Sequence, residues 1–282
     1  MNLVEYIAKA APYLEEHGVA SPRLNAELIL GKVLGITRLE IYTGFERELD
    51  PRQAEEYRQL VMRRAQGVPL QYITGAAAFY GRDFDVSPGV FIPRPETEIL
   101  VEAVLKELPE EAKVLDLCTG CGNIAVTIAL EKQAAAVTAV DTGDSAVAAC
   151  RKNALKFGVS DRVRVLAGDL YSALDDDDVY DAVVANPPYV AAGKLGALPV
   201  EVREHEPATA LEAGEDGLDF IRAIVAGAPR RVARGGLLAL EVDEDQPERV
   251  SRDILRGRTW EKVQVLNDLN KRPRVVMARL SK

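Results

Sequence analysis

The sequence is poor in the residues that build disulfide frameworks and metal centres. Among 282 residues there are three cysteines, Cys118, Cys121 and Cys150, and two histidines, His17 and His205. Three cysteines do not form a disulfide framework. A zinc site needs four ligands, and these five residues are scattered along the chain. We therefore expect no metal, and we interpret Cys118-x-x-Cys121 as small side chains lining a turn.

Long hydrophobic runs and an excess of positive charge are also missing. No uninterrupted apolar stretch approaches the ~20 residues of a membrane span, and Met1–Glu5 lacks the features of a signal peptide. Asp and Glu number 44 against 35 Lys and Arg, so the net charge is −9. Such a balance disfavours binding to nucleic-acid backbones. We expect a cytoplasmic protein with no membrane association and no direct nucleic-acid partner.

Residues 1–67 have the pattern of a small helical bundle. Apolar residues recur at helical spacing, Ser21-Pro22 has the chemistry of an N-cap and first helical position, and Asp50-Pro51 begins another helix. The bundle either packs as an appendage or recognises a partner. Residues 68–90 follow, where Gln71–Gly75 and Phe79–Val86 have strand composition interrupted by glycine, which predicts a β-hairpin linker.

Residues 91–282 predict an α/β domain. From Lys113 onward strand and helix patterns alternate, which is typical of a mostly parallel sheet with helices on both faces. The predicted strands are 113–117, 136–140, 162–166, 180–185, 236–242, 260–266 and 273–279, and the predicted helices are 122–131, 144–157, 217–233 and 246–256. Ligands of such sheets bind beyond the carboxyl ends of the strands. The acidic run Asp175–Asp178 is interpreted as a solvated loop.

The segment Val114–Ala125 predicts a strand, a tight turn and a helix start. Gly120 and Gly122 allow close approach of the backbone to a ligand. The G-x-G-x-x-G spacing of dinucleotide sites is absent. Asp116 opens the turn instead, and an acid suits a cationic ligand such as S-adenosyl-L-methionine. The candidate cofactor-binding residues of this turn are Cys118, Thr119, Gly120, Cys121 and Gly122.

Two more acids follow predicted strands. Asp141 ends the second strand, and a carboxylate there can accept both ribose hydroxyls; the alternative is an acid at the N-terminus of the helix that begins near Asp144. Gly168-Asp169-Leu170 follows the third strand. Asp169 is a candidate acceptor for the adenine amino group and Leu170 for packing on the ring, with a surface turn as the alternative.

The most informative motif is Asn186-Pro187-Pro188-Tyr189, which follows the apolar run 180–185. The side-chain oxygen of Asn186 and the carbonyl of Pro187 form a pair of acceptors for a planar –NH2 group. The two prolines fix φ and remove competing donors, and Tyr189 supplies a flat wall. The motif therefore predicts methyl transfer to an amide or aromatic amine. A rigid turn after a strand is the alternative.

With these motifs the chain resembles the PrmC/HemK family, the glutamine methyltransferases of peptide-chain release factors. The resemblance covers about residues 20–280, and Ile92–Glu98 combined with Asn186–Tyr189 is its most specific part. The other matching stretches are Arg23–Leu28, Pro69–Gly75, Glu201–Arg203, Glu206-Pro207 and Asp216–Asp219.

This resemblance implies a Rossmann-like, seven-stranded class I methyltransferase domain behind an N-terminal helical domain. It implies S-adenosyl-L-methionine as cofactor and, as substrate, the glutamine of the Gly-Gly-Gln loop of class 1 release factors. It assigns cofactor contacts to Cys118–Gly122, Asp141, Leu170 and Asn186, and substrate contacts to Asn186, Pro187, Pro188 and Tyr189.

The sequence departs from the family pattern at three places. Cys118 replaces a usual glycine and would be strained if its φ is positive. Glu241-Val242-Asp243 replaces Glu-Ile-Gly, and 268–274 lacks the usual glycine-containing turn.

For the mechanism we expect in-line methyl transfer, with Asn186, Pro187 and Tyr189 orienting the amide nitrogen and no strong general base. Arg94, between two prolines, is either a substrate contact or a structural clamp paired with Glu96 or Glu98. We expect a monomer. The rival functions are a DNA or RNA adenine amino methyltransferase, which would flip its base, and a non-catalytic adaptor.

Overall fold

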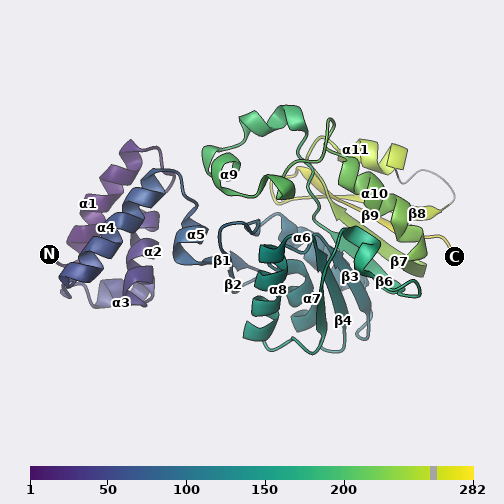
Figure 1. Cartoon of the computed structure of the whole chain (residues 1–282), viewed down its shortest axis with the longest axis horizontal. Helices are drawn as coiled ribbons and strands as arrows, with labels where there is room; N and C mark the ends of the chain where they lie inside the picture. The colour runs from purple at the N-terminus through teal and green to yellow at the C-terminus, as the bar shows by residue number, and fades with distance from the viewer. Residues whose placement is uncertain (255–258) are drawn as a thin grey trace. The chain divides into compact units, whose positions relative to one another are not determined.

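The chain forms two compact units in a computed structural model that describes residues 1–254 and 259–282 (Figure 1). Unit 1 comprises Met1–Ala76 and Pro199–His205, and unit 2 comprises Ala77–Leu198 and Glu206–Lys282. The division falls at the start of the first strand, β1 (Ala76–Phe79). Residues 199–205 therefore interrupt unit 2 in the sequence but pack in unit 1.

Unit 1 is a bundle of helices with its own apolar core. Its helices are α1 (Leu3–Glu16), α2 (Pro22–Leu34), α3 (Arg38–Thr43), α4 (Pro51–Ala65), α5 (Leu70–Thr74) and the inserted α9 (Val200–His205). The core includes Leu3, Ile7, Leu14, Ile29, Leu30 and Ile41, all at most 1% exposed. Arg64 of α4, itself buried, pairs with Glu201 of α9 at 2.8 Å, which fixes α9 to the bundle.

In unit 1 the predicted start of α2 is confirmed, with Ser21 as the N-cap residue and Pro22 as the first helical residue, but the expected capping bond is absent and the predicted strand at Gln71–Gly75 is wrong. Ser21 precedes α2 in a left-handed conformation, φ 52°, and its side chain makes no capping bond. The Asn25 side chain donates to the carbonyls of Ala20 and Ser21 at 2.9 and 3.1 Å, which fixes the turn before α2 but does not cap its N–H groups. The segment Gln71–Gly75 contributes to helix α5 rather than to a strand, because Gly75 ends it at φ 80° and Tyr72 and Ile73 are both buried, which strand alternation forbids.

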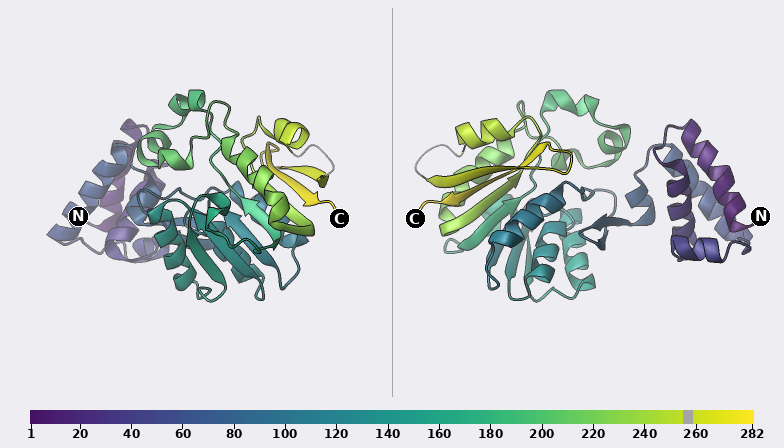
Figure 2. Two further views of the ribbon diagram at one scale, coloured as in Figure 1. Left: turned by 45° about the vertical axis from the view of Figure 1, so that its right-hand side comes forward. Right: turned by 180° about the vertical axis from the view of Figure 1, so that it is seen from behind.

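Unit 2 begins with a hairpin, β1 and β2 (Arg82–Asp85), and continues with α6 (Thr97–Glu107) and a seven-stranded sheet of order β5-β4-β3-β6-β7-β9-β8. The strands are β3 (Lys113–Leu117), β4 (Ala136–Asp141), β5 (Val163–Ala167), β6 (Tyr180–Ala185), β7 (Val232–Glu241), β8 (Trp260–Asn267) and β9 (Pro273–Leu280). All seven predicted strands are confirmed. The antiparallel β8 and β9 form one edge, drawn in yellow in Figure 2.

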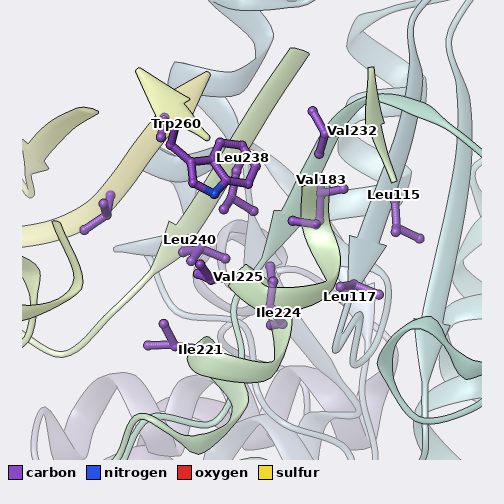
Figure 3. Close-up of a cluster of buried hydrophobic side chains, with 14 of the residues drawn as sticks. Leu115, Leu117, Val183, Ile221, Ile224, Val225, Val232, Leu238, Leu240 and Trp260 are labelled. Atoms are coloured by element: carbon purple, nitrogen blue, oxygen red, sulfur yellow. The ribbon is translucent and has the colours of Figure 1, made fainter. Parts of the chain in front are cut away.

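The strand order fixes where the helices lie. From β3 the chain moves outward to β4 and β5 through α7 (Asn123–Glu131) and α8 (Asp144–Lys156), and from β6 it moves the other way to β7 through α10 (Asp219–Gly227). Right-handed crossovers therefore place α7 and α8 on one face and α10 on the other. The α10 side is a core of strand and helix side chains, with Leu115, Val183, Leu238, Ile221 and Ile224 among its members (Figure 3).

Two predicted helices are shorter than expected. The helix predicted at 217–233 ends at Gly227, because Pro229 cannot continue it. The helix predicted at 246–256 is a short α11 (Pro247–Arg249) followed by a π-helical turn, η5 (Val250–Ile254). Its last two predicted residues lie outside the described part of the chain.

Candidate active site

Two loops meet at the carboxyl edge of the sheet. Strands β3 and β6 are parallel neighbours, and the chain runs in opposite directions along the sheet from this pair. Residues 118–122 follow β3 and residues 186–189 follow β6. This is the topological switch point at which open α/β sheets bind ligands. The structure thus brings together the two motifs that the sequence singled out.

The turn after β3 is tight, and several of its residues have a left-handed backbone conformation. Gly120 and Gly122 have φ of 56° and 82°, and the Gly122 N–H donates to the carbonyl of Thr119 at 2.8 Å. A Cβ on Gly122 would lie 2.5 Å from the sulfur of Cys150, so only glycine fits there. A Cβ on Gly120 would meet nothing within 4 Å. The backbone at Gly120 therefore faces open space, as a ligand-binding turn requires.

Cys118 is strained. Its φ of 58° lies in the left-handed region that disfavours side chains, so the replacement of the family's glycine is not harmless. Leu170 also has a positive φ, 47°. Strained residues of this kind gather at ligand sites, and here both lie in loops that follow sheet strands at the carboxyl edge.

We expect Cys118→Gly to be more stable than Cys118→Ala by about 1 kcal/mol, because alanine keeps the left-handed strain and glycine removes it. Calorimetry would show this as a melting temperature about 2–4 °C higher. Equal melting temperatures of the two variants would contradict the strain.

Asp116 stabilises the turn through buried hydrogen bonds. It is fully buried, and its Oδ2 accepts from the Thr119 hydroxyl at 2.5 Å and from the Ala125 N–H at 3.2 Å. Its Oδ1 has no hydrogen-bond partner. Burial raises the pKa of Asp116 to about 7. The acid that opens the turn therefore fixes the N-terminus of α7 to the loop.

Asp141 holds the same turn from the neighbouring strand. Its two carboxylate oxygens each accept one backbone N–H at 2.9 Å, from Gly120 and from Gly143. A carboxylate oxygen has two lone-pair sites, so each oxygen keeps one acceptor position for a vicinal diol. Gly143 directly precedes α8, so its bond to Asp141 places this acid near the N-terminus of the helix. Asp141 therefore also matches the alternative interpretation, an acid at a helix N-terminus.

The candidate cofactor site is surrounded by negative charge. Burial raises the pKa of the Cys118 thiol, and the carboxylates of Asp141, Asp116 and Asp169 raise it further. Asp169 is exposed, and its backbone N–H donates to Ser172. The carboxylates of Asp141 and Asp169 beside the turn fit a ligand with cationic ammonium and sulfonium groups better than a phosphate. The open space at Gly120 and the free lone pairs of Asp141 fit the same ligand.

The motif after β6 is anchored by residues that the sequence analysis did not assign. The Nδ2 of Asn186 donates to the hydroxyl oxygen of Thr97 at 3.1 Å. The Tyr189 hydroxyl lies 3.5 Å from Oε1 of Glu241. Pro187 and Pro188 are buried, whereas Asn186 and Tyr189 are half-buried. Thr97 lies in the family-like stretch Ile92–Glu98, and Glu241 begins the stretch that departs from the family pattern. No local pattern shows that both lie beside Asn186–Tyr189.

The backbone of Tyr189 is also fixed. Its carbonyl accepts from the Gln246 side chain at 2.9 Å, and a Cβ on Gly217 would lie 2.4 Å from the same oxygen. Gly217 has φ 74°. The glycine in the Asp216–Asp219 stretch thus lets this segment lie directly against the backbone of Tyr189.

Arg94 pairs with neither Glu96 nor Glu98. Its guanidinium forms an ion pair with Glu206 and lies 4.8 Å from the ring centroid of Phe91. Glu206 is buried and also accepts from the Ile92 N–H at 3.3 Å. Glu98 instead accepts from the Tyr80 N–H at 2.7 Å. These contacts favour the clamp over the substrate contact for Arg94.

The described residues contain no group of three or more His, Cys, Asp or Glu side chains placed to hold a metal. The three cysteines are free. No helix within 1–254 and 259–282 is long and apolar enough to cross a membrane.

The fold and the turn after β3 define a class I methyltransferase. Two solved structures share the fold. A methyltransferase from Pyrococcus furiosus matches with a TM-score of 0.53 at 17% identity, over 73% of this chain and 92% of that chain. The T. thermophilus 16S rRNA N2 G1207 methyltransferase, in complex with AdoMet and guanosine, matches with a TM-score of 0.52 at 23% identity. This match covers 73% of this chain and 49% of that chain.

Sequence relatives define the family within this class. The PrmC N-terminal domain family matches residues 5–75, and the methyltransferase small domain family matches residues 83–201. Release factor glutamine methyltransferase of Moorella thermoacetica is 41% identical over 281 residues, 99% of this chain and 98% of that protein. The protein of that name from Geobacter sulfurreducens is 43% identical over 238 residues, 84% and 83%. The chain belongs to the release factor glutamine methyltransferase family and is a methyltransferase that uses S-adenosyl-L-methionine.

Proposed function

We propose that this protein methylates the side-chain amide nitrogen, N5, of the glutamine in the Gly-Gly-Gln motif of class 1 peptide chain release factors. Its relatives carry the name of that activity. The observation that supports it in this chain is the orientation of Asn186. Because Nδ2 donates to Thr97, Oδ1 lies on the opposite side of the amide group and is left as an acceptor.

The chain's own residues orient the nucleophile. Asn186 Oδ1 and the Pro187 carbonyl accept the two N–H hydrogens of the substrate carboxamide, which directs the nitrogen lone pair away from them. Tyr189 stacks on the amide plane and excludes water. Positioning of this kind is worth several kcal/mol, roughly 7–11 in the best cases. The cofactor supplies an electrophilic methyl on a sulfonium, whose leaving group is neutral and needs no acid. After transfer the methylated nitrogen is positively charged and acidic, and it releases one of its two hydrogens as a proton to solvent water.

The other parts of the chain have supporting roles in this proposal. Asp141 receives the ribose hydroxyls, Asp169 the adenine amino group, and Leu170 packs on the ring. The helical domain, residues 1–67, recognises the release factor. The linker, residues 68–90, connects it to the methyltransferase domain, residues 91–282, which catalyses the methyl transfer. The protein acts as a cytoplasmic monomer without a nucleic-acid partner, and Arg94 holds the segment before α6.

Incubation with S-adenosyl-L-methionine and a purified release factor tests the proposal. We expect a mass increase of one methyl group on the peptide that contains Gly-Gly-Gln, located on the glutamine by fragmentation. A release factor with that glutamine replaced by alanine should gain no mass. An unmodified release factor, together with a methylated adenine oligonucleotide in a parallel reaction, would favour the nucleic-acid rival. Binding without any mass change would favour the adaptor.

A further inference from the structure

Glu241 is a buried acid with incomplete hydrogen bonding beside the candidate active site. It ends β7, is 1% exposed, and its Oε2 has no hydrogen-bond partner. Burial raises its pKa to about 7. A carboxylate in such surroundings costs folding free energy. Buried acids with perturbed pKa values are common at functional sites, so the neighbours of Glu241 are informative.

Those neighbours connect Glu241 to both ends of the Asn186–Tyr189 motif. The Tyr189 hydroxyl lies 3.5 Å from its Oε1. Thr97 is 1% exposed, and the interaction of its hydroxyl with the ionised carboxylate lowers the pKa of Glu241, as that of the Tyr189 hydroxyl also does. A hydroxyl has a single hydrogen. When Thr97 donates that hydrogen to Glu241, its oxygen can only accept from Asn186.

We propose that Glu241 is a positioning residue, which takes the hydrogens of the Thr97 and Tyr189 hydroxyls and thereby fixes Asn186 with Nδ2 on Thr97 and Oδ1 toward the substrate amide. This inference rests on the proposed function, because it assigns Asn186 Oδ1 as the acceptor. It makes Glu241 act through two other side chains and not through contact with substrate or cofactor.

The proposal requires the ionised carboxylate. A protonated Glu241 donates its own hydrogen to one of the hydroxyls, and the Thr97 hydrogen is then free to point at Asn186. The Asn186 amide would then turn over to accept it, which brings Oδ1 to Thr97 and takes the acceptor away from the substrate amide. The charged and titratable groups around Glu241 are Arg274 and Tyr189, which lower its pKa, and Glu96, which raises it. The neutral Thr97 hydroxyl also lowers this pKa, and Asp243 and Arg94 act on Tyr189. Methyl transfer should therefore fall as the pH falls through about 7.

The first test is Glu241→Gln, assayed with a release factor at several pH values. We expect a loss of about 10- to 100-fold in kcat at pH 8 with little change in cofactor affinity, and the disappearance of the rise in kcat near pH 7. Thr97→Val should give a similar loss, and the two changes together should cost less than their product. Thr97→Ser should keep more activity than Thr97→Val. Glu261→Gln, at an exposed glutamate of β8, serves as the matched control.

A second readout does not depend on activity. The pKa of Glu241 is raised in the folded protein, so its contribution to stability is present below the unfolded pKa and is lost as the pH rises through about 7. Glu241→Gln should therefore melt at a higher temperature than wild type at pH 8 but not at pH 4. Lower stability together with lower activity would show a structural role and overturn the proposal, and so would unchanged kcat. If wild type fails to methylate the release factor, the proposed function itself is wrong.

Discussion

Asn186→Ala is expected to lower kcat for methylation of the release factor by about 100- to 1000-fold, the cost of removing one preorganised polar group from a developing charge. The substrate amide would lose one of its two acceptors, and its nitrogen lone pair would no longer be aimed. The binding of S-adenosyl-L-methionine, measured by isothermal titration calorimetry, should change by less than about tenfold, roughly the worth of one hydrogen bond.

The comparison between turnover and binding is what tests the role. Asn270→Ala, at an exposed asparagine far along the sequence, controls for generic effects of the substitution. An equal loss in kcat and in cofactor affinity would assign Asn186 to cofactor binding alone. A fully active Asn186→Ala protein would remove the basis of the proposed mechanism.

The parts of this site that local patterns predicted are those built by consecutive residues. The strand before Cys118 and the glycines of the following turn specify their backbone course by themselves, because glycine alone tolerates φ > 0 without cost. The same holds for the apolar run before Asn186. Parallel pairing of β3 and β6 then brings together two loops that are about 65 residues apart in the sequence. The alternation of strand and helix patterns over residues 113–279 is enough to predict such a sheet.

The contacts that local patterns did not predict connect distant residues. Arg94 pairs with Glu206, which is 112 positions away, although two acids stand closer in the sequence. Asn186 meets Thr97 across 89 positions, and Tyr189 meets Glu241 across 52. Nothing in a helical or strand period specifies these pairs, because they depend on which loops the sheet brings to one edge.

Local propensity also failed where tertiary contacts decided the conformation. Gln71–Gly75 has strand-forming residues, but burial of both Tyr72 and Ile73 in one short segment requires a helical turn. Residues 199–205 lie between β6 and α10 in the sequence, yet their contacts are with unit 1. Ser21 has good capping chemistry, but its left-handed backbone conformation leaves its side chain without a capping bond.

Asp141→Ala is expected to weaken the binding of S-adenosyl-L-methionine by about 100- to 10,000-fold, since two hydrogen bonds to a charged group, at about 1.5–3 kcal/mol each, amount to about 3–6 kcal/mol. The variant loses the acceptors for two ribose hydroxyls and the two backbone bonds to Gly120 and Gly143. Asp144→Ala removes an exposed acid at the start of α8 and should bind the cofactor nearly as wild type does.

A ligand analogue separates ribose recognition from support of the turn. Wild type should bind S-adenosyl-L-homocysteine more tightly than its 2′-deoxy analogue, whereas Asp141→Ala should bind the two almost equally, because the acceptor for that hydroxyl is gone. Calorimetry well below the melting temperature of each protein supplies the four dissociation constants of this cycle. If removal of the 2′-hydroxyl weakens binding by the same factor in both proteins, Asp141 shapes the turn through Gly120 without contacting the ribose. The ribose assignment then fails.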